Sequence, residues 1–269
     1  MTKKILITGA NGQLGHEMRN ALKGNNRFEC IFTDVAELDI CNAEAVKQII
    51  ANNHIDYIVN CAAYTQVDKA EDNAELCKKI NTDAVENLAR AAATYGARMI
   101  HISTDYVFNG RGYRPYTEDV VPDPQSVYGS TKLEGEKILT DICPESIIIR
   151  TAWLYSPYGN NFVKTMLHLG EEREELSVVA DQIGTPTCAA DLAQAILVIL
   201  QADTFVPGTY HFSDEGACSW YDFTVTIHRL AGITTCRVTP IRSDEYPSKA
   251  HRPFYSCLLY TSDAADDRI

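Results

Sequence analysis

Short apolar runs alternate with helical patterns through the first half of the chain. A short apolar run bounded by turn residues predicts a buried strand, and apolar residues three or four apart predict one helix face. Because strands that are apolar throughout must be covered on both faces, the alternation indicates an α/β fold with a parallel sheet between two helix layers. Right-handed crossovers then predict a doubly wound, Rossmann-like sheet. The predicted strands are 5–7, 28–33, 57–62, 99–103 and 147–149, and the predicted helices are 14–22, 43–51, 83–95 and 127–139.

The second half is less regular and is predicted to add a smaller lobe. It contains helical patterns at 191–200 and 222–230 and a short strand at 208–212. With 269 residues, the chain is long enough for two lobes that share a core. We expect a dinucleotide-binding domain made of residues 1–151 with about 188–210, and a C-terminal substrate-binding lobe made of 152–187 with 211–256.

Three glycines follow the first predicted strand, in the run GANGQLG at 9–15. Glycine allows the chain to turn sharply and lets the backbone approach a ligand closely, and the helix that follows offers free N–H groups to a phosphate. We therefore predict that Gly9, Asn11, Gly12 and Gly15 bind a nucleotide pyrophosphate. The spacing is G-x-x-G-x-x-G and not the G-x-G-x-x-G fingerprint, and a plain structural turn is the alternative.

Asp34 stands at the end of the second predicted strand. A carboxylate at this place can accept hydrogen bonds from the adenosine ribose, and it repels a 2′-phosphate. This favours NADH as the cofactor. The nearby cations Lys3, Lys4 and Arg27 leave NADPH open, and a solvated loop aspartate is the alternative.

Tyr128 and Lys132 are one helical turn apart, so a phenol and an ammonium share one helix face. A phenol has a pKa of about 10 and is a poor proton relay unless its anion is stabilised, which a neighbouring ammonium can do. Thr104 ends a predicted strand, at the edge where open α/β sheets bind ligands. We predict Tyr128 as the acid, Lys132 as its charged partner and Thr104 as the group that binds a carbonyl oxygen. A surface helix pair is the alternative for Tyr128 and Lys132.

Composition excludes several classes of function. The net charge of −12 argues against a nucleic-acid or anionic-membrane surface, which needs clustered lysine and arginine. No run approaches the roughly 18 apolar residues of a membrane span, and the apolar run at the N-terminus is too short for a signal peptide. The nine scattered cysteines form no C-x-x-C pair and are predicted to be reduced core residues. A cytoplasmic protein is expected.

Longer motifs resemble a known family. The runs GANGQLG at 9–15, STDYVF at 103–108 and YGSTK at 128–132 occur in the order found in extended short-chain dehydrogenase/reductases. Within that superfamily, the chain is similar to the dTDP-4-dehydrorhamnose reductase family. Further matching pieces lie at 38–40, 60–65, 67–71, 150–153, 159–162, 181–187 and 252–253, so the resemblance extends over residues 5–256.

The resemblance implies the NADPH- or NADH-dependent reduction of the 4-keto group of dTDP-4-dehydro-L-rhamnose to dTDP-L-rhamnose. It implies that Tyr128 and Lys132 are catalytic, with Thr104 orienting, and that both also contact the cofactor. The other implied cofactor residues are Gly12, Gln13, Leu14, Asp34, Asp39, Ile40, Ala62, Ala63 and Thr65. The implied substrate residues are Thr104, Asp105, Tyr106, Trp153, Asn161 and Arg252, with core packing as the alternative for the two aromatic residues and a surface role for Arg252.

Two classes of rival function follow from the same motifs, and the first is another sugar-nucleotide enzyme of the same superfamily. A sugar-nucleotide 4,6-dehydratase needs an Asp-Glu pair after the catalytic threonine, whereas Thr104 is followed here by Asp105 and Tyr106. Epimerases usually carry a larger substrate lobe than this chain can form. A cofactor-binding regulatory subunit without catalysis is the other rival, and the retention of Tyr128 with Lys132 argues against it.

The resemblance breaks near the C-terminus. After Leu258 the family continues into a closing helix, whereas this chain reads LYTSDAADDRI, and our hypothesis is that 257–269 form an atypical tail foreign to the family. The expected partner is the small sugar nucleotide, with no nucleic acid and no membrane, and the expected state is a monomer or homodimer. Some relatives use Mg²⁺, for which the sequence assigns no ligands.

Overall fold

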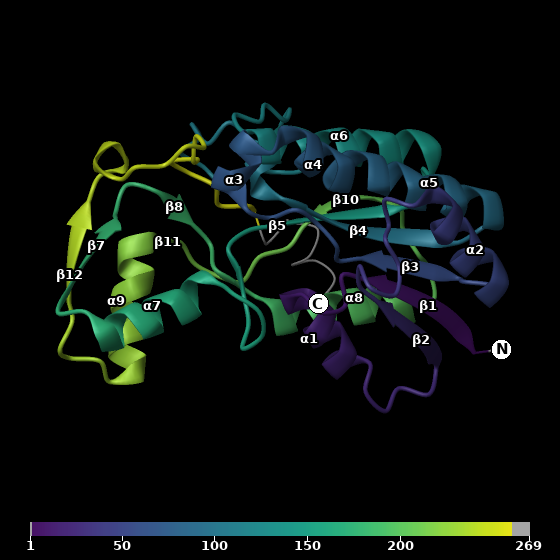
Figure 1. Cartoon of the computed structure of the whole chain (residues 1–269), viewed down its shortest axis with the longest axis horizontal. Helices are drawn as coiled ribbons and strands as arrows, with labels where there is room; N and C mark the ends of the chain where they lie inside the picture. Colours follow the sequence, from purple (N-terminus) through teal and green to yellow (C-terminus); the bar gives the residue numbers. More distant parts are fainter. Residues whose placement is uncertain (1, 260–269) are drawn as a thin grey trace.

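The centre of the computed structural model, which describes residues 2–259, is a six-stranded sheet with every strand parallel (Figure 1). The strand order is β10-β5-β4-β3-β1-β2, so the order reverses between β1 and β3. Open sheets bind ligands at such a reversal, beyond the carboxyl ends of the strands. The strands are β1 (Lys3–Thr8), β2 (Phe28–Thr33), β3 (Tyr57–Asn60), β4 (Arg98–Thr104), β5 (Ile147–Thr151) and β10 (Gly208–His211).

Helices cover both faces of this sheet, which confirms the doubly wound α/β prediction (Figure 1). Helices α1 (Gln13–Ala21) and α8 (Ala189–Gln201) pack together on one face. Helices α2 (Ala43–Asn53), α5 (Ala84–Tyr95) and α6 (Val127–Ile142) pack on the other. Most side chains of the inner strands β1, β3, β4 and β5 are buried between the two layers, and this burial is the main stabilising contribution to the fold.

One segment of this half was not predicted as helix. Residues between β3 and α5 form α3 (Val67–Asp72), α4 (Ala74–Lys78) and a π-helical turn, η1 (Lys79–Asp83). The side chain of Asn81 in this turn accepts from Tyr64 N at 2.8 Å and donates to Tyr64 O at 3.1 Å. A helix held by tertiary hydrogen bonds of this kind leaves only a weak periodic signal in the sequence.

The second half contributes a smaller lobe beside the sheet, seen at the left of Figure 1. Its helices α7 (Phe162–Glu172) and α9 (Trp220–Ala231) pack together. Strands β7 (Glu175–Val179) and β12 (Arg237–Ile241) pair in parallel beside them. The sequence prediction began α9 two residues late and ended it one residue early, because the capping box of Ser219 and Asp222 starts the helix at Trp220. The remaining short elements are η2 (Asp105–Val107), β6 (Leu154–Tyr155), β8 (Ile183–Gly184), β9 (Thr187–Cys188), β11 (Cys218–Ser219) and η3 (Ser243–Glu245).

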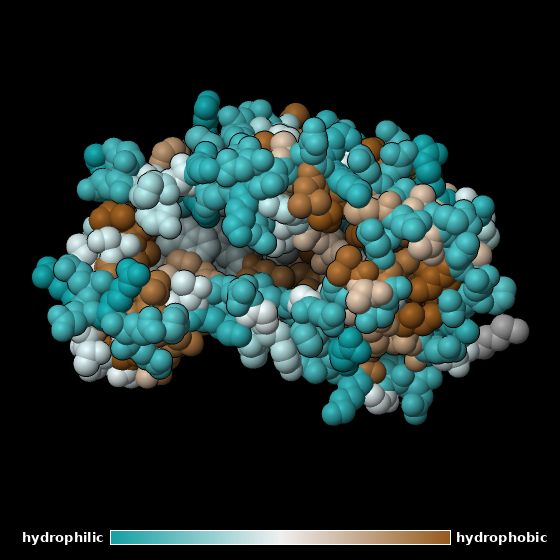
Figure 2. Space-filling model, viewed as in Figure 1, coloured by the Kyte–Doolittle hydropathy of each residue, from teal (hydrophilic) through white to brown (hydrophobic). Residues whose placement is uncertain are grey.

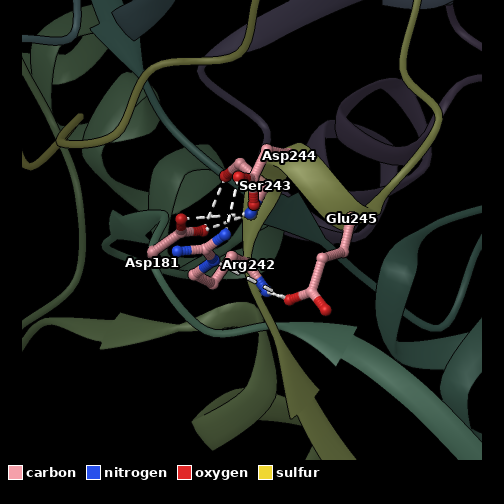
Figure 3. A network of polar contacts seen from close by, with 5 residues as sticks. All are labelled: Asp181, Arg242, Ser243, Asp244 and Glu245. Carbon is pink, nitrogen blue, oxygen red and sulfur yellow. Dashed lines mark hydrogen bonds and ion pairs between the residues drawn. The ribbon is translucent and has the colours of Figure 1, made fainter.

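A polar network holds the segment that follows β12, where the chain leaves the small lobe (Figure 3). The Asp181 carboxylate accepts from Ser243 N at 2.9 Å and from Ser243 Oγ at 2.6 Å. The Arg242 guanidinium donates to Asp244 at 2.8 Å, and Arg242 N donates to Glu245 at 2.8 Å. These bonds connect the loop after β7 with η3, and they set the path by which the chain returns to the sheet.

The chain re-enters the main body at its last described residues. Leu258 is fully buried, and the backbone of Tyr116 exchanges hydrogen bonds with Cys257 O at 2.9 Å and Leu259 N at 2.8 Å. The rest of the predicted tail, 260–269, lies outside the described residues. All nine cysteines lie within residues 2–259 and carry free thiols. In that same range, no helix has both the length and the apolar character to cross a membrane.

Candidate active site

A cavity of about 500 Å³ opens at the carboxyl edge of the sheet, between the sheet and the small lobe. Figure 2 shows the surface hollowed at this place, with apolar atoms in the depth of the hollow. Three of its walls come from the loop after β1, the ends of β4 and β5, and the first turns of α6. The predicted residues that line it are Gly12, Gln13, Leu14, Ala63, Thr65, Thr104, Asp105, Tyr106, Tyr128, Lys132, Trp153, Asn161 and Arg252.

Two glycines of the loop are required by close packing. Gly9 has a φ of +64°, and a Cβ at this residue would lie 2.6 Å from Ala62 N. A Cβ at Gly15 would lie 2.3 Å from Gly9 O and 2.5 Å from Ala10 Cα. The absence of a side chain at both residues therefore allows α1 to pack close to β1 and β3. Neither residue lines the cavity.

Gly12 is placed differently, because it does line the cavity. It is the N-cap of α1 and supplies no side-chain cap, so the first N–H groups of the helix have no partner from that residue. Only Gly9 O would lie near a Cβ at Gly12, at 3.2 Å. The free N–H groups can donate to a phosphate, and the positive end of the helix dipole attracts its negative charge. This end of the cavity therefore fits the predicted nucleotide.

Replacing Gly15 with alanine is expected to destabilise the protein by at least about 1–3 kcal/mol, because backbone atoms cannot move aside as a flexible side chain can. Denaturant unfolding measures this loss. Gly12→Ala is the matched control, and it should keep most of the stability while weakening nucleotide binding. Equal stability of the two variants would show that the close approach at Gly15 is not needed.

Five other predicted cofactor residues do not line the cavity, namely Asn11, Asp34, Asp39, Ile40 and Ala62. The Asp34 carboxylate accepts from Asn11 N at 2.9 Å and Val35 N at 2.8 Å, so it braces the glycine loop. Asp39 accepts from Cys41 N at 2.9 Å. Ile40 is buried in the core, and Ala62 packs against Gly9. Their predicted contacts with a cofactor stay predictions.

Tyr128 lies in the first turn of α6, which begins there because the Ser126 side chain accepts from Gly129 N at 3.1 Å. The phenol is 9% exposed, so the surface-pair alternative is wrong. Burial raises its pKa above the ordinary value of 10, and the nearby Asp105 carboxylate adds to the rise, while a hydrogen bond with Thr104 opposes it. A phenol in this setting stays protonated at neutral pH.

Thr104 connects the phenol to a buried carboxyl group. Its Oγ1 accepts from Tyr106 N at 3.2 Å and donates to Asp105 Oδ1 at 2.9 Å. The other oxygen, Asp105 Oδ2, is buried without a partner among the described residues. Burial raises the pKa of Asp105 to about 6, although the hydrogen bonds it accepts oppose the rise. The role expected of Thr104, a donor to a carbonyl oxygen, stays a prediction.

Lys132 follows Tyr128 by one helical turn and is 1% exposed. Its Nζ donates to Ile102 O at 2.6 Å and lies 3.3 Å from His101 Nε2. Both contacts direct the amine toward β4. Burial lowers its pKa to about 8, against an opposing effect of Glu136 and Cys77. The expected stabilisation of a Tyr128 anion by Lys132 stays a prediction.

Aromatic residues from the small lobe also line the cavity, and most of them were not predicted from the sequence. Trp153 stacks on Trp220 with ring centroids 3.3 Å apart, and Phe162 lies against Trp220 at 4.4 Å. Trp153 has a φ of +48°, and Gly184 leaves room for its indole. The aromatic cluster at the start of α9 was the available signal for Trp220, but the sequence alone does not place it beside Trp153.

The remaining predicted substrate residues, Asn161 and Arg252, also line the cavity. Asn161 caps α7 through Lys164 N at 3.0 Å and donates to Gln13 Oε1 at 2.9 Å, so its amide connects the lobe to α1. Arg252 forms an ion pair with Asp68 and carries its charge next to Tyr106. Burial raises the pKa of Tyr106 to about 12, with Arg252 opposing. Within the described part of the chain, no three His, Cys, Asp or Glu side chains gather to hold a metal.

Comparison with known proteins places these features in one family. A model of the RmlD substrate binding domain matches residues 3–266. A dTDP-4-dehydrorhamnose reductase from Aggregatibacter actinomycetemcomitans is 42% identical over 267 residues, which is 96% of this chain and 91% of the relative.

Two solved structures are similar over nearly the whole chain. A dTDP-4-dehydrorhamnose reductase from Clostridium acetobutylicum is 51% identical with a TM-score of 0.91, covering 95% of this chain and 89% of that one. A dTDP-4-dehydrorhamnose reductase from Bacillus anthracis in complex with NADP is 41% identical with a TM-score of 0.94, covering 99% and 93%.

Proposed function

The chain belongs to the RmlD substrate binding domain family, and on this premise we propose that it reduces the 4-keto group of dTDP-4-dehydro-L-rhamnose with NADPH or NADH. The observation that carries the proposal is that Tyr128, Thr104 and Lys132 line the same cavity as the uncapped end of α1. A proton donor and a nucleotide site therefore meet at one ligand-sized opening.

The residues divide the chemistry between them. A reduced nicotinamide, when bound, supplies the hydride, and Gly12, Gln13, Leu14 and Thr65 are placed to hold the dinucleotide. Tyr128 gives its proton to the substrate oxygen as that oxygen gains negative charge. Its raised pKa suits this task, because the acid must still hold its proton when the substrate arrives. Transfer to an alkoxide, a far stronger base than a phenolate, is favourable.

The residue after Asp105 supports reduction over dehydration. A 4,6-dehydration needs a carboxylate beside this aspartate, and Tyr106 stands there instead. With a pKa of about 12, the Tyr106 phenol stays neutral and cannot act as that base. Its edge lies against the Tyr128 ring with centroids 5.4 Å apart, so it closes the site next to the acid.

The test is an assay of the purified chain with dTDP-4-dehydro-L-rhamnose and either NADPH or NADH. We expect loss of the reduced-nicotinamide absorbance with one or both cofactors, and dTDP-L-rhamnose as the product identified by NMR. Turnover only with a different 4-keto sugar nucleotide would replace the proposed substrate. Cofactor binding without turnover of any of them would favour the regulatory-subunit function and overturn the proposal.

Two further properties belong to the same proposal. We propose that the protein acts in the cytoplasm, which the nine free thiols support because a reducing compartment keeps cysteines unpaired. We also propose that the small lobe, 152–187 with 211–256, binds the sugar nucleotide through Trp153, Asn161 and Arg252.

A further inference from the structure

A buried polar chain leads from Lys132, which lines the cavity, to three residues that do not line it. It joins Thr8 at the end of β1, Asn60 at the end of β3, His101 in β4 and Lys132 in α6. Each of the four is at most 1% exposed. Asn60 and His101 are register partners in the sheet, so their contact is built into the strand pairing. Buried polar side chains need partners of matching donor and acceptor character, so the direction of each bond can be derived.

The backbone fixes the orientation of the Asn60 amide. Its Oδ1 accepts from Thr8 Oγ1 at 2.6 Å and from Ala62 N at 3.2 Å. A backbone N–H can only donate, so this atom must be the amide oxygen. The other end is therefore the amide nitrogen, and Asn60 Nδ2 donates to His101 Nδ1 at 3.0 Å.

This bond determines which ring nitrogen of His101 carries the proton. Nδ1 accepts, so the proton of the neutral imidazole is on Nε2, which lies 3.3 Å from Lys132 Nζ. The ring is neutral, because burial and the neighbouring Lys132 hold the pKa of His101 well below its usual range. An Nε2–H group needs a lone pair to accept its hydrogen bond. A neutral amine has one and an ammonium does not.

We infer that His101 is a positioning residue that stabilises the neutral amine of Lys132 by donating from Nε2–H to Nζ. In this form Lys132 gives one N–H to Ile102 O at 2.6 Å and receives the His101 bond on its lone pair. Its second N–H is left for the cavity. As an ammonium, Lys132 still donates to Ile102 O. A second N–H of the ammonium then points at the Nε2–H of His101, and the two donors repel each other.

The inference gives Lys132 a part in the cycle, and here it rests on the proposed function. Reduction leaves Tyr128 as a phenolate, which must regain a proton. In the balanced step an N–H bond of the Lys132 ammonium breaks, an O–H bond forms at Tyr128, and Lys132 becomes the amine that His101 stabilises. A solvent proton later restores the ammonium. His101 keeps its Nε2 proton through this step. Its Nδ1 has no proton to pass on and already accepts from Asn60, whose Oδ1 in turn accepts from the Thr8 hydroxyl.

Other groups around Lys132 make this exchange accessible near neutral pH. Glu136, one turn further along α6, and Cys77 of α4 raise its pKa, while burial lowers it to about 8. Tyr128 lies one turn before it on the same helix. Glu136 is also paired with Arg150, and burial is the largest single influence on the Lys132 pKa.

The first experiment reads the tautomer of His101 directly, by NMR of isotope-labelled histidine nitrogens in the wild-type protein. We expect a protonated Nε2 and an unprotonated Nδ1 that do not titrate across the range in which the protein stays folded. A protonated Nδ1, or a doubly protonated ring, would overturn the inference. No substrate is needed, so this result is independent of the proposed function.

The second experiment compares pH profiles of turnover. Activity should fall as pH rises through the Lys132 pKa, because the ammonium is the proton donor. In His101→Gln an amide oxygen can accept from the ammonium, so the fall should move up by about one pH unit or more. The control is His228→Gln, a buried histidine of the small lobe, which should keep the wild-type profile. A His101→Gln profile that matches wild type would assign His101 to packing alone.

Discussion

Replacing Tyr128 with phenylalanine is expected to reduce turnover by about 10²- to 10⁴-fold, which is the usual contribution of a positioned acid. The change removes a single oxygen from a ring that is 9% exposed, so the shape of the cavity is kept. Steady-state kinetics measure the loss, and fluorescence titration with the reduced cofactor measures binding. We expect cofactor affinity close to wild type, because the variant leaves the glycine loop unchanged.

The control for this variant is Tyr155→Phe. Tyr155 is a second phenol of the same cavity, held edge-on against Phe223 at 5.9 Å, and no proton transfer is assigned to it. Its variant should retain turnover close to wild type. If Tyr128→Phe also retained it, the proton would come from another group, and the buried Asp105 with its unpartnered oxygen would become the candidate acid.

The sequence predicted the part of the site that depends on local order along the chain. The Gly9–Gly15 loop lies where strand-turn-helix order places it, at the reversal of the sheet. The spacing of Tyr128 and Lys132 put both on the buried side of α6. These positions follow from helix geometry and strand direction, which a sequence pattern carries directly.

The rest of the site depends on contacts between distant segments. Trp220 reaches the cavity only because α9 packs on α7 and its ring stacks on Trp153. His101 appears in the sequence only as one residue of an apolar strand, and its function follows from a register partner, Asn60, and from Lys132 on a helix. Patterns along one chain do not encode such pairs, because each partner alone is an ordinary buried residue.

Replacing Glu136 with alanine is expected to cost about 3–5 kcal/mol of the free energy of unfolding, a large share of the 5–15 kcal/mol typical of a folded domain. The side chains of Glu136 and Arg150 are 5% and 6% exposed, and three contacts of 2.7, 3.0 and 3.3 Å join them. Removal of one partner leaves the other charge buried between β5 and α6 without compensation. Denaturant unfolding measures the difference.

The control is Glu86→Ala, which breaks an exposed pair with Arg90 one turn apart on α5. Solvent screens that pair, so its loss should cost under about 1 kcal/mol. A double variant, Glu136→Leu with Arg150→Met, should recover most of the stability lost in Glu136→Ala, because apolar groups of similar volume remove the uncompensated charge. If Glu136→Ala cost no more than Glu86→Ala, water or a neighbouring group would be solvating Arg150. The buried pair would then contribute to the position of α6 more than to the stability of the fold.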